Sequence, residues 1–207
     1  MMLIQMAKPA MRLLMICGLC FANTVLAESN RLPDQIKNTE TTIADIEGKL
    51  RKPFQDGQSK ASVLIFVTHD CPISNAYSPE LSRLRNEYGS KGFNMMLIYV
   101  DPDVSDDDIK AHMKDFKLTG YTAIPDREHQ LVKASGATVT PEVAVVLPDG
   151  SISYRGRIDN MYPALGQRRR VITEKELRNA LDAIGANQPV KISRTQAVGC
   201  YAPNLKF

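Results

Sequence analysis

Residues 62–74 read SVLIFVTHDCPIS, and this stretch decides the fold. The apolar run from Val63 to Val67 predicts a buried strand. Pro72 follows with a helical pattern behind it, and proline suits the first position of a helix, where its missing N–H costs nothing. Cys71 is therefore expected at a helix N-terminus, where free backbone N–H groups and the helix dipole favour a thiolate. Because a thiolate is the nucleophile of disulfide and peroxide chemistry, the stretch predicts redox chemistry at Cys71, on a sulfur open to incoming reagents.

The first 27 residues have the composition of a secretory signal. Lys8 and Arg12 precede an apolar stretch over 13–26, and the segment contains no acidic residue. It ends in a small residue that suits cleavage. The segment is too short and too weakly flanked for a membrane span. We expect an exported protein, periplasmic or extracellular, that is soluble once the signal is removed. A second start at Met11 stays open.

Length and charge limit the remaining chain to one ordinary domain. The 207 residues are 43% hydrophobic, and the net charge of +3 falls to +1 when the signal is removed. Neither value indicates a nucleic-acid partner, and we expect no cofactor and no metal. The predicted organisation is a signal peptide (1–27), a loose lead-in (28–40), an α/β domain (41–189) and a tail (190–207).

Four cysteines occur, and export divides them into two pairs. Cys17 and Cys20 form a C-x-x-C pattern inside the signal, without the strand and helix that a redox motif needs. The mature chain keeps Cys71 and Cys200, in a compartment where disulfides persist. Three readings stay open for Cys200: a free thiol, an intermolecular bridge, or the partner of Cys71.

Hydrophobic periodicity predicts alternating strands and helices. A hairpin over 42–50 comes first. Ser105 is expected to cap the helix at 106–116. Thr173 is expected to cap the last helix, in a capping box with Glu176. Strands are predicted at 63–67, 93–100, 143–147 and 151–158, and helices after Cys71 through Tyr88 and at 106–116, 128–134 and 173–184. This order predicts an α/β fold with a central mixed sheet and helices on both faces.

Three positions carry a resemblance to a known superfamily. Cys71 follows a central strand and opens a helix, and Pro79 lies eight residues later, where thioredoxins place a helix-kinking proline. Thr140 and Pro141 precede a buried strand, like the cis-proline loop that faces the active cysteine. The chain thus resembles the thioredoxin-like superfamily over about residues 40–187. Within it, the chain looks like exported redoxin-type proteins of the alkyl hydroperoxide reductase and thiol-specific antioxidant kind, which carry an N-terminal β-hairpin extension.

The resemblance implies where a substrate binds. A cis Pro141 leaves the Thr140 backbone as an edge on which an extended substrate pairs, as in β-augmentation. Pro72, next to the nucleophile, belongs to the same substrate-binding group. Glu142 is expected to be an exposed polar residue before the strand.

Two arginines complete the candidate substrate-binding residues. Arg155 and Arg157 alternate on one strand face, and Tyr154 precedes them. Arg157 is the candidate for supporting a thiolate or orienting a peroxide, and the alternative for both is a solvated face.

Two departures from the superfamily pattern bear on the chemistry. Ser74 stands where a thioredoxin has its second cysteine, so a mixed disulfide on Cys71 cannot be resolved by a neighbour. Ser74 can still donate a hydrogen bond to the thiolate, and Cys200, glutathione or another protein must resolve it. Thr68 and Cys71, three residues apart, resemble part of the peroxiredoxin signature. That signature also has a proline four residues before the threonine, and this chain has Leu64 at that position.

Three functions follow as hypotheses. The first is an exported thiol-disulfide oxidoreductase acting on protein or small-molecule disulfides or thiols, with Cys71 as nucleophile. The second is a thiol peroxidase of the peroxiredoxin kind, in which a sulfenic acid on Cys71 condenses with Cys200 and an arginine near Thr68 is needed. The third is a non-enzymatic binding or metal-delivery module.

Overall fold

The computed structural model describes residues 36, 39–55 and 57–204. The predicted signal peptide, with Cys17 and Cys20, lies outside these residues. Among the described helices, none combines the length and the apolar character needed to cross a bilayer.

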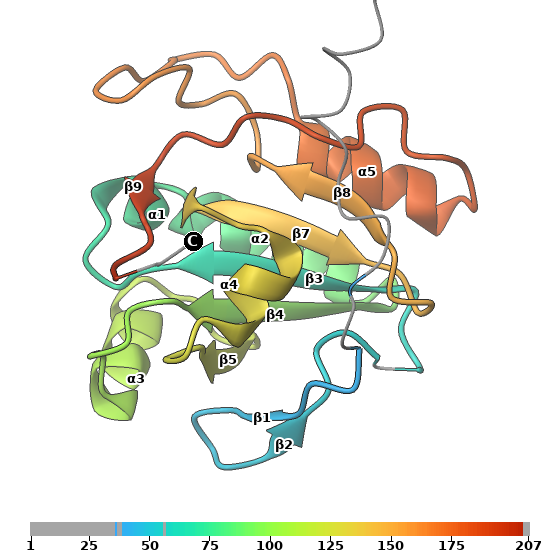
Figure 1. The fold of residues 1–207 in the computed structure, drawn as a ribbon. Coiled ribbons are helices and arrows are strands. Elements are labelled where there is room, and N and C mark those ends of the chain that lie inside the picture. Colours follow the sequence, from blue (N-terminus) through green and yellow to red (C-terminus); the bar gives the residue numbers. More distant parts are fainter. Residues whose placement is uncertain (1–35, 37–38, 56, 205–207) are drawn as a thin grey trace, which may run out of the picture. The chain divides into compact units, whose positions relative to one another are not determined.

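A five-stranded mixed sheet forms the centre of the fold (Figure 1). Its three parallel strands lie side by side, then β7 runs antiparallel to β3, and β8 runs antiparallel to β7. Across the sheet, the order is β5 (Thr122–Pro125), β4 (Phe93–Tyr99), β3 (Ala61–Val67), β7 (Glu142–Val146) and β8 (Ile152–Gly156). Every residue of β3 is buried, which explains why the sequence has a continuous apolar run there. The predicted mixed α/β architecture is confirmed.

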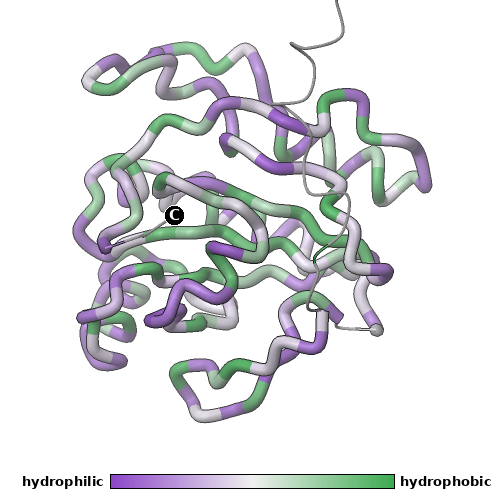
Figure 2. The backbone as a smooth tube through the Cα atoms, in the orientation of Figure 1, coloured by the Kyte–Doolittle hydropathy of each residue, from purple (hydrophilic) through white to green (hydrophobic). Residues whose placement is uncertain are grey.

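Helices pack on both faces of this sheet. Figure 2 shows the apolar strands as the green centre of the tube, between more polar connections. One apolar cluster joins the sheet to α2 and α5, and a second cluster on the other face includes side chains of α4. The helices are α1 (Pro72–Ala76), α2 (Ser78–Gly89), α3 (Asp106–Asp115), α4 (Gln130–Ser135) and α5 (Glu176–Gly185).

The N-terminal hairpin is present as two short antiparallel strands, β1 (Ile43–Ala44) and β2 (Leu50–Arg51). Asp45 fixes its turn, because its Oδ1 accepts hydrogen bonds of 2.9 Å from the backbone N–H groups of Glu47 and Lys49. Gly48 takes the left-handed conformation (φ 77°) that glycine adopts without steric cost. The predicted hairpin over 42–50 is confirmed.

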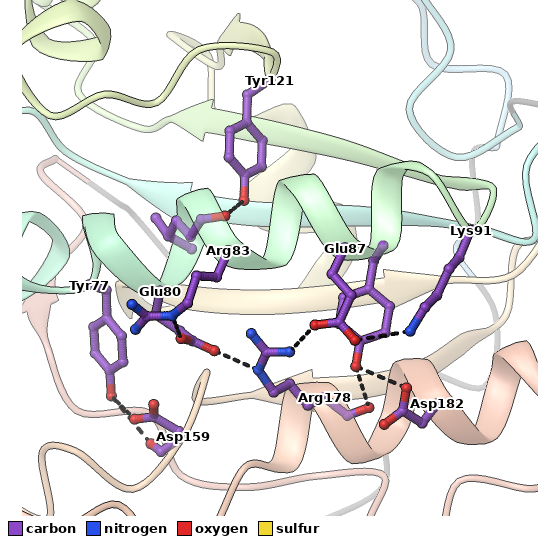
Figure 3. Close-up of polar contacts among 11 residues, drawn as sticks. Tyr77, Glu80, Arg83, Glu87, Lys91, Tyr121, Asp159, Arg178 and Asp182 are labelled. Atoms are coloured by element: carbon purple, nitrogen blue, oxygen red, sulfur yellow. Dashed lines mark hydrogen bonds and ion pairs between the residues drawn. The ribbon is translucent and has the colours of Figure 1, made fainter.

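Polar contacts join α2 to α5 (Figure 3). Along the chain, α2 follows α1, the helix that starts directly after Cys71. The Arg178 guanidinium bridges two carboxylates of α2, with Nε 2.6 Å from Glu80 Oε1 and Nη1 on Glu87. Nearby, the Tyr88 hydroxyl donates to Asp182 Oδ1 at 2.9 Å. These contacts hold the helix behind the site against the last helix of the domain.

Two details differ from the sequence-based expectation. Thr173 does not cap the last helix: it exchanges hydrogen bonds with Asn160, and α5 begins three residues later, after Lys175. Glu176 pairs with Arg157 instead of closing a capping box. Strand β5 was not predicted, because its four residues TAIP are too short to show a period.

Candidate active site around Cys71 and Cys200

Cys71 occupies the N-cap of α1, directly after the loop that leaves β3. Its backbone is extended (φ −74°, ψ 114°), and its sulfur accepts a hydrogen bond of 3.5 Å from the backbone N–H of Ser74. Pro72 is the first helical residue, as predicted. Ser74 is buried, and its backbone N–H rather than its hydroxyl makes the recorded hydrogen bond to the sulfur. The helix is interrupted at Tyr77, and α2 starts afresh with a proline in its first turn.

The tail brings Cys200 to the same place. The two sulfur atoms are 2.8 Å apart although the residues are 129 positions apart in sequence. Both cysteines are free thiols here, and a disulfide bond needs a separation of about 2.05 Å. Of the three readings left open for Cys200, this arrangement corresponds to the one in which Cys200 is the partner of Cys71.

The proline loop lies on the other side of the Cys71 sulfur. The Thr140–Pro141 peptide bond is cis, as the resemblance implied. The Cys71 sulfur is 3.2 Å from the Thr140 carbonyl oxygen, to which it donates a hydrogen bond only in its protonated form. The short strand β6 (Val139–Thr140) of this loop pairs antiparallel with β9 (Cys200–Tyr201), and Thr140 stands opposite Cys200. Figure 1 shows β9 beside the start of α1.

The electrostatics make the two thiols unequal. Burial raises the pKa of the Cys71 thiol, but hydrogen bonds from Cys200 and the Ser74 N–H outweigh it, so the pKa lies below the ordinary thiol value. Burial, the contact with Cys71 and the charge of Asp70 together raise the pKa of Cys200 to about 12. With Cys71 ionised, Cys200 is the hydrogen-bond donor. The arrangement therefore favours one thiolate, on Cys71, facing one thiol.

The expectation that the Cys71 sulfur is open to reagents is wrong. Cys71 is 2% exposed, whereas Cys200 is partly exposed. Two of the groups that contact the Cys71 sulfur come from segments distant in sequence, namely the tail and the loop with the cis proline. A local strand-to-helix pattern cannot show that such segments cover the helix end.

Glu142 is also not the exposed residue that its position suggested. It is 5% exposed, and its Oε2 accepts a 2.8 Å hydrogen bond from the backbone N–H of Thr138. Its Oε1 forms an ion pair with Arg155, at 3.4 Å from Nε. Burial of this carboxylate is tolerated because a cation and backbone donors compensate it. Glu142 therefore holds the residues just before the cis proline.

The two arginines of the β8 region have different partners. Arg155 pairs with Glu142 and donates to the carbonyl of Ser135, the last residue of α4, whereas Arg157 pairs with Glu176 of α5. Gly156 between them has a φ of 148° and is the last residue of β8, so Arg157 lies beyond the strand. The predicted shared, solvated face is therefore wrong, and a substrate role for Arg157 requires its ion pair to open.

Asn75 belongs to a hydrogen-bond network that the sequence analysis did not predict. Its Nδ2 donates to the backbone carbonyl of His69 at 3.0 Å, and its Oδ1 lies 2.8 Å from His112 Nε2. Since this oxygen can only accept, His112 carries its proton on Nε2, and Nδ1 accepts from the Tyr99 hydroxyl at 2.8 Å. This hydrogen-bond network links α3 and β4 to the loop before Cys71. No sequence spacing signals it, because the residues come from three elements.

Thr68 follows β3 and is buried. Within the described ranges, no group of three or more His, Cys, Asp or Glu side chains is placed to hold a metal ion. The chemistry that the site supports with the residues present is that of two adjacent thiols.

Comparisons with known proteins give one family match and several solved structures of similar fold. The family model described as Redoxin matches residues 34–165, and no curated protein matches the chain. A hypothetical protein from Sinorhizobium meliloti 1021 has a similar structure (TM-score 0.70, 21% identity, 83% of this chain and 93% of that one).

Two further solved structures share the fold. An uncharacterised conserved protein from Geobacillus kaustophilus superposes with a TM-score of 0.69 at 24% identity, over 84% of this chain and 94% of that one. A secreted disulfide oxidoreductase of Mycobacterium tuberculosis, homologous to DsbE of E. coli, gives 0.51 at 17% identity, over 70% and 97%. These likenesses establish the thioredoxin-like fold.

Proposed function

The chain belongs to the Redoxin family, and on that premise we propose that it is a thiol-disulfide oxidoreductase with Cys71 as nucleophile and Cys200 as resolving thiol. The observation that carries the proposal is the 2.8 Å separation of the two sulfurs. The contrast between the lowered pKa of Cys71 and the raised pKa of Cys200 supports this division of roles.

In the first step, the Cys71 thiolate attacks one sulfur of a substrate disulfide. A bond forms between Cys71 and that sulfur, the substrate S–S bond breaks, and the other substrate sulfur leaves as a thiolate that takes up a proton. The Ser74 N–H, which stabilises Cys71 as a thiolate, also makes Cys71 a better leaving group in the reverse direction.

In the second step, Cys200 loses its proton and attacks the Cys71 sulfur of the mixed disulfide. The Cys71–Cys200 bond forms, and the second substrate sulfur leaves as a thiolate. Two electrons have then passed from the cysteine pair to the substrate, which is reduced to two thiols. An external dithiol then reduces the Cys71–Cys200 disulfide back to two thiols. If that disulfide is a stronger oxidant than the substrate disulfide, the same steps run in reverse and oxidise substrate thiols.

The test is to trap the mixed disulfide, in chains that carry Cys17→Ser and Cys20→Ser. With glutathione disulfide, Cys200→Ser should accumulate glutathione on Cys71, because the resolving thiol is missing. Cys71→Ser should form far less adduct, and the chain with both cysteines should end as the internal disulfide. Mass spectrometry of non-reduced peptides reads all three. Equal adduct on Cys200 in the Cys71→Ser chain would contradict the assignment of roles.

We further propose that this chemistry takes place after export, in the periplasm or outside the cell. Support comes from the composition of residues 1–27, with Lys8 and Arg12 at the start of an apolar stretch. The N-terminal sequence of the protein recovered from cells tests this. A mature chain that begins near Glu28 is expected, and a cytoplasmic protein that retains residue 1 would contradict it.

Peroxide is the second candidate oxidant, and the spacing of Thr68 and Cys71, which resembles part of the peroxiredoxin signature, supports it. The Cys71 thiolate would attack one peroxide oxygen, so that the O–O bond breaks, the other oxygen leaves as hydroxide and is protonated to water, and Cys71 becomes a sulfenic acid. Cys200 would then attack the Cys71 sulfur, the S–OH bond would break with loss of water, and the same disulfide would form. Consumption of hydrogen peroxide with a thiol reductant separates the two functions. Turnover that exceeds that on glutathione disulfide would assign the peroxidase.

A further inference from the structure

The tail strand occupies the edge on which an extended substrate is expected to pair. Val139 and Thr140 of β6 stand opposite Tyr201 and Cys200 of β9, and the Ala202 N–H donates to the Thr138 carbonyl at 3.2 Å. The tail thus uses the hydrogen-bonding groups of this edge itself. Its cysteine lies where a substrate cysteine must lie to react with the buried sulfur of Cys71.

Gly199 shows that the tail is fitted to this edge. A Cβ atom at this position would lie 2.0 Å from the Thr140 carbonyl oxygen and 2.5 Å from its carbon. Both are backbone atoms, which cannot move aside as a flexible side chain can. Only glycine therefore allows β9 to approach β6 this closely.

The tail is held unequally along its length. Upstream, Ser193 and Thr195 exchange backbone hydrogen bonds of 2.9 and 3.0 Å with Arg155 of β8. The Thr195 hydroxyl also bonds to the Tyr154 hydroxyl at 2.8 Å and accepts from the Arg157 N–H at 3.0 Å. This part of the tail is an anchor on the sheet.

Beyond the anchor, residues 196–204 are held more weakly. Their strand has only two residues, and Tyr201, the largest side chain, is 82% exposed. The residues of this segment that are buried are small: Ala197, Gly199 and Ala202. Segments with few buried apolar contacts open at a lower free energy than the core.

We propose that residues 196–204 form a redox-controlled strap that stands in for an extended polypeptide substrate. While Cys71 and Cys200 are reduced, the strap opens and closes about its anchor at Thr195, and a polypeptide cysteine reaches Cys71 in the open state. Once the internal disulfide forms, the strap is locked on the β6 edge. The proposal rests on the proposed function, because it assigns the substrate class of the same site, polypeptides with a flexible cysteine-bearing segment.

The first test uses full-length chains in which Cys17, Cys20 and Cys200 are serine, so that Cys71 is the single thiol. Gly199→Ala should displace the strap, and Gly185→Ala is the matched control, since its new Cβ meets only ring carbons of Phe93 at 3.9 Å. The probe is an extended peptide of about ten residues with one cysteine activated as a thiopyridyl disulfide. Gly199→Ala should form the mixed disulfide about tenfold faster than Gly185→Ala. Equal rates would overturn the strap.

A second measurement needs no substitution in the strap. The Ala202 N–H, bonded to Thr138, should exchange with solvent much faster than the core Val100 N–H in the reduced protein, and should slow on oxidation. Ala202 protection equal to that of Val100 in the reduced state would overturn the proposal even if Gly199→Ala does not fold. Failure of every chain to react with glutathione disulfide would count against the proposed function, whereas the exchange of Ala202 reports on the strap alone.

Discussion

Reduction of the Cys71–Cys200 disulfide is expected to lower the free energy of unfolding by about 4–5 kcal/mol. The bond joins residues 129 positions apart, and a crosslink over a loop of this length removes about 17 cal/mol/K of entropy from the unfolded chain, or about 5 kcal/mol at 25 °C. The folded state should change little, because the sulfurs are already 2.8 Å apart and β9 is already paired with β6.

Urea unfolding of the oxidised and the reduced protein, followed by far-ultraviolet circular dichroism, measures this difference. With a slope of about 2 kcal/mol per molar urea, the midpoint should fall by about 2 M on reduction. Cys200→Ser serves as the control, since its midpoint should not respond to reductant. Mass spectrometry verifies the bond before each titration.

One result would refute the reasoning. If the verified disulfide leaves the midpoint within about 0.3 M of that of the reduced protein, forming the bond distorts the folded state by as much as it restricts the unfolded one. The tail would then not rest in the reduced protein where the disulfide needs it.

Three further outcomes are expected. Cys200→Ala should raise the pKa of Cys71, because it removes a hydrogen bond that stabilises the charged sulfur; pH-dependent alkylation measures the pKa, and a fall would contradict the prediction. Acidification from pH 7 to pH 4 should cost up to about 3 kcal/mol of stability through His112, whose pKa burial lowers to about 4. The unfolded chain, with an ordinary imidazole near 6.5, binds more protons in this window, so stability is lost as the pH falls; urea titrations should show a flatter profile for His112→Gln. Glu142→Gln should destabilise the protein by about 3 kcal/mol, since it leaves a buried arginine without its anion. In the same thermal or urea assay, Glu47→Gln, at an exposed pair, should change stability by less than about 0.5 kcal/mol, and equal effects would contradict the argument.

Much of the fold was predictable because its signals are local. The apolar run over 63–67 is a buried central strand, Ser105 caps α3, and Pro79 stands in the first turn of α2 after the helix break. Each of these depends on neighbours in sequence, so the pattern itself carries the information. Strand β5 escaped because four residues are too few to establish a period.

The corrections share a physical cause. Glu142 reads as a polar residue at a strand start, and only the facing Arg155 and the Thr138 N–H make its burial stable. The Asn75 and His112 pair likewise depends on helices packing against each other. Sequence spacing does not reveal such partners, because they are set by the packing of different elements rather than by a fixed separation along the sequence.

The sequence by itself determined that Cys71 sits at a helix N-terminus after a buried strand, because strand period, proline and cap are properties of adjacent residues. Tertiary structure alone decided what faces that sulfur. The tail crosses the sheet edge, Gly199 lets it come close to Thr140, and Cys200 arrives 2.8 Å from Cys71. That contact depends on the packing of the whole domain between the two cysteines, which no local pattern encodes.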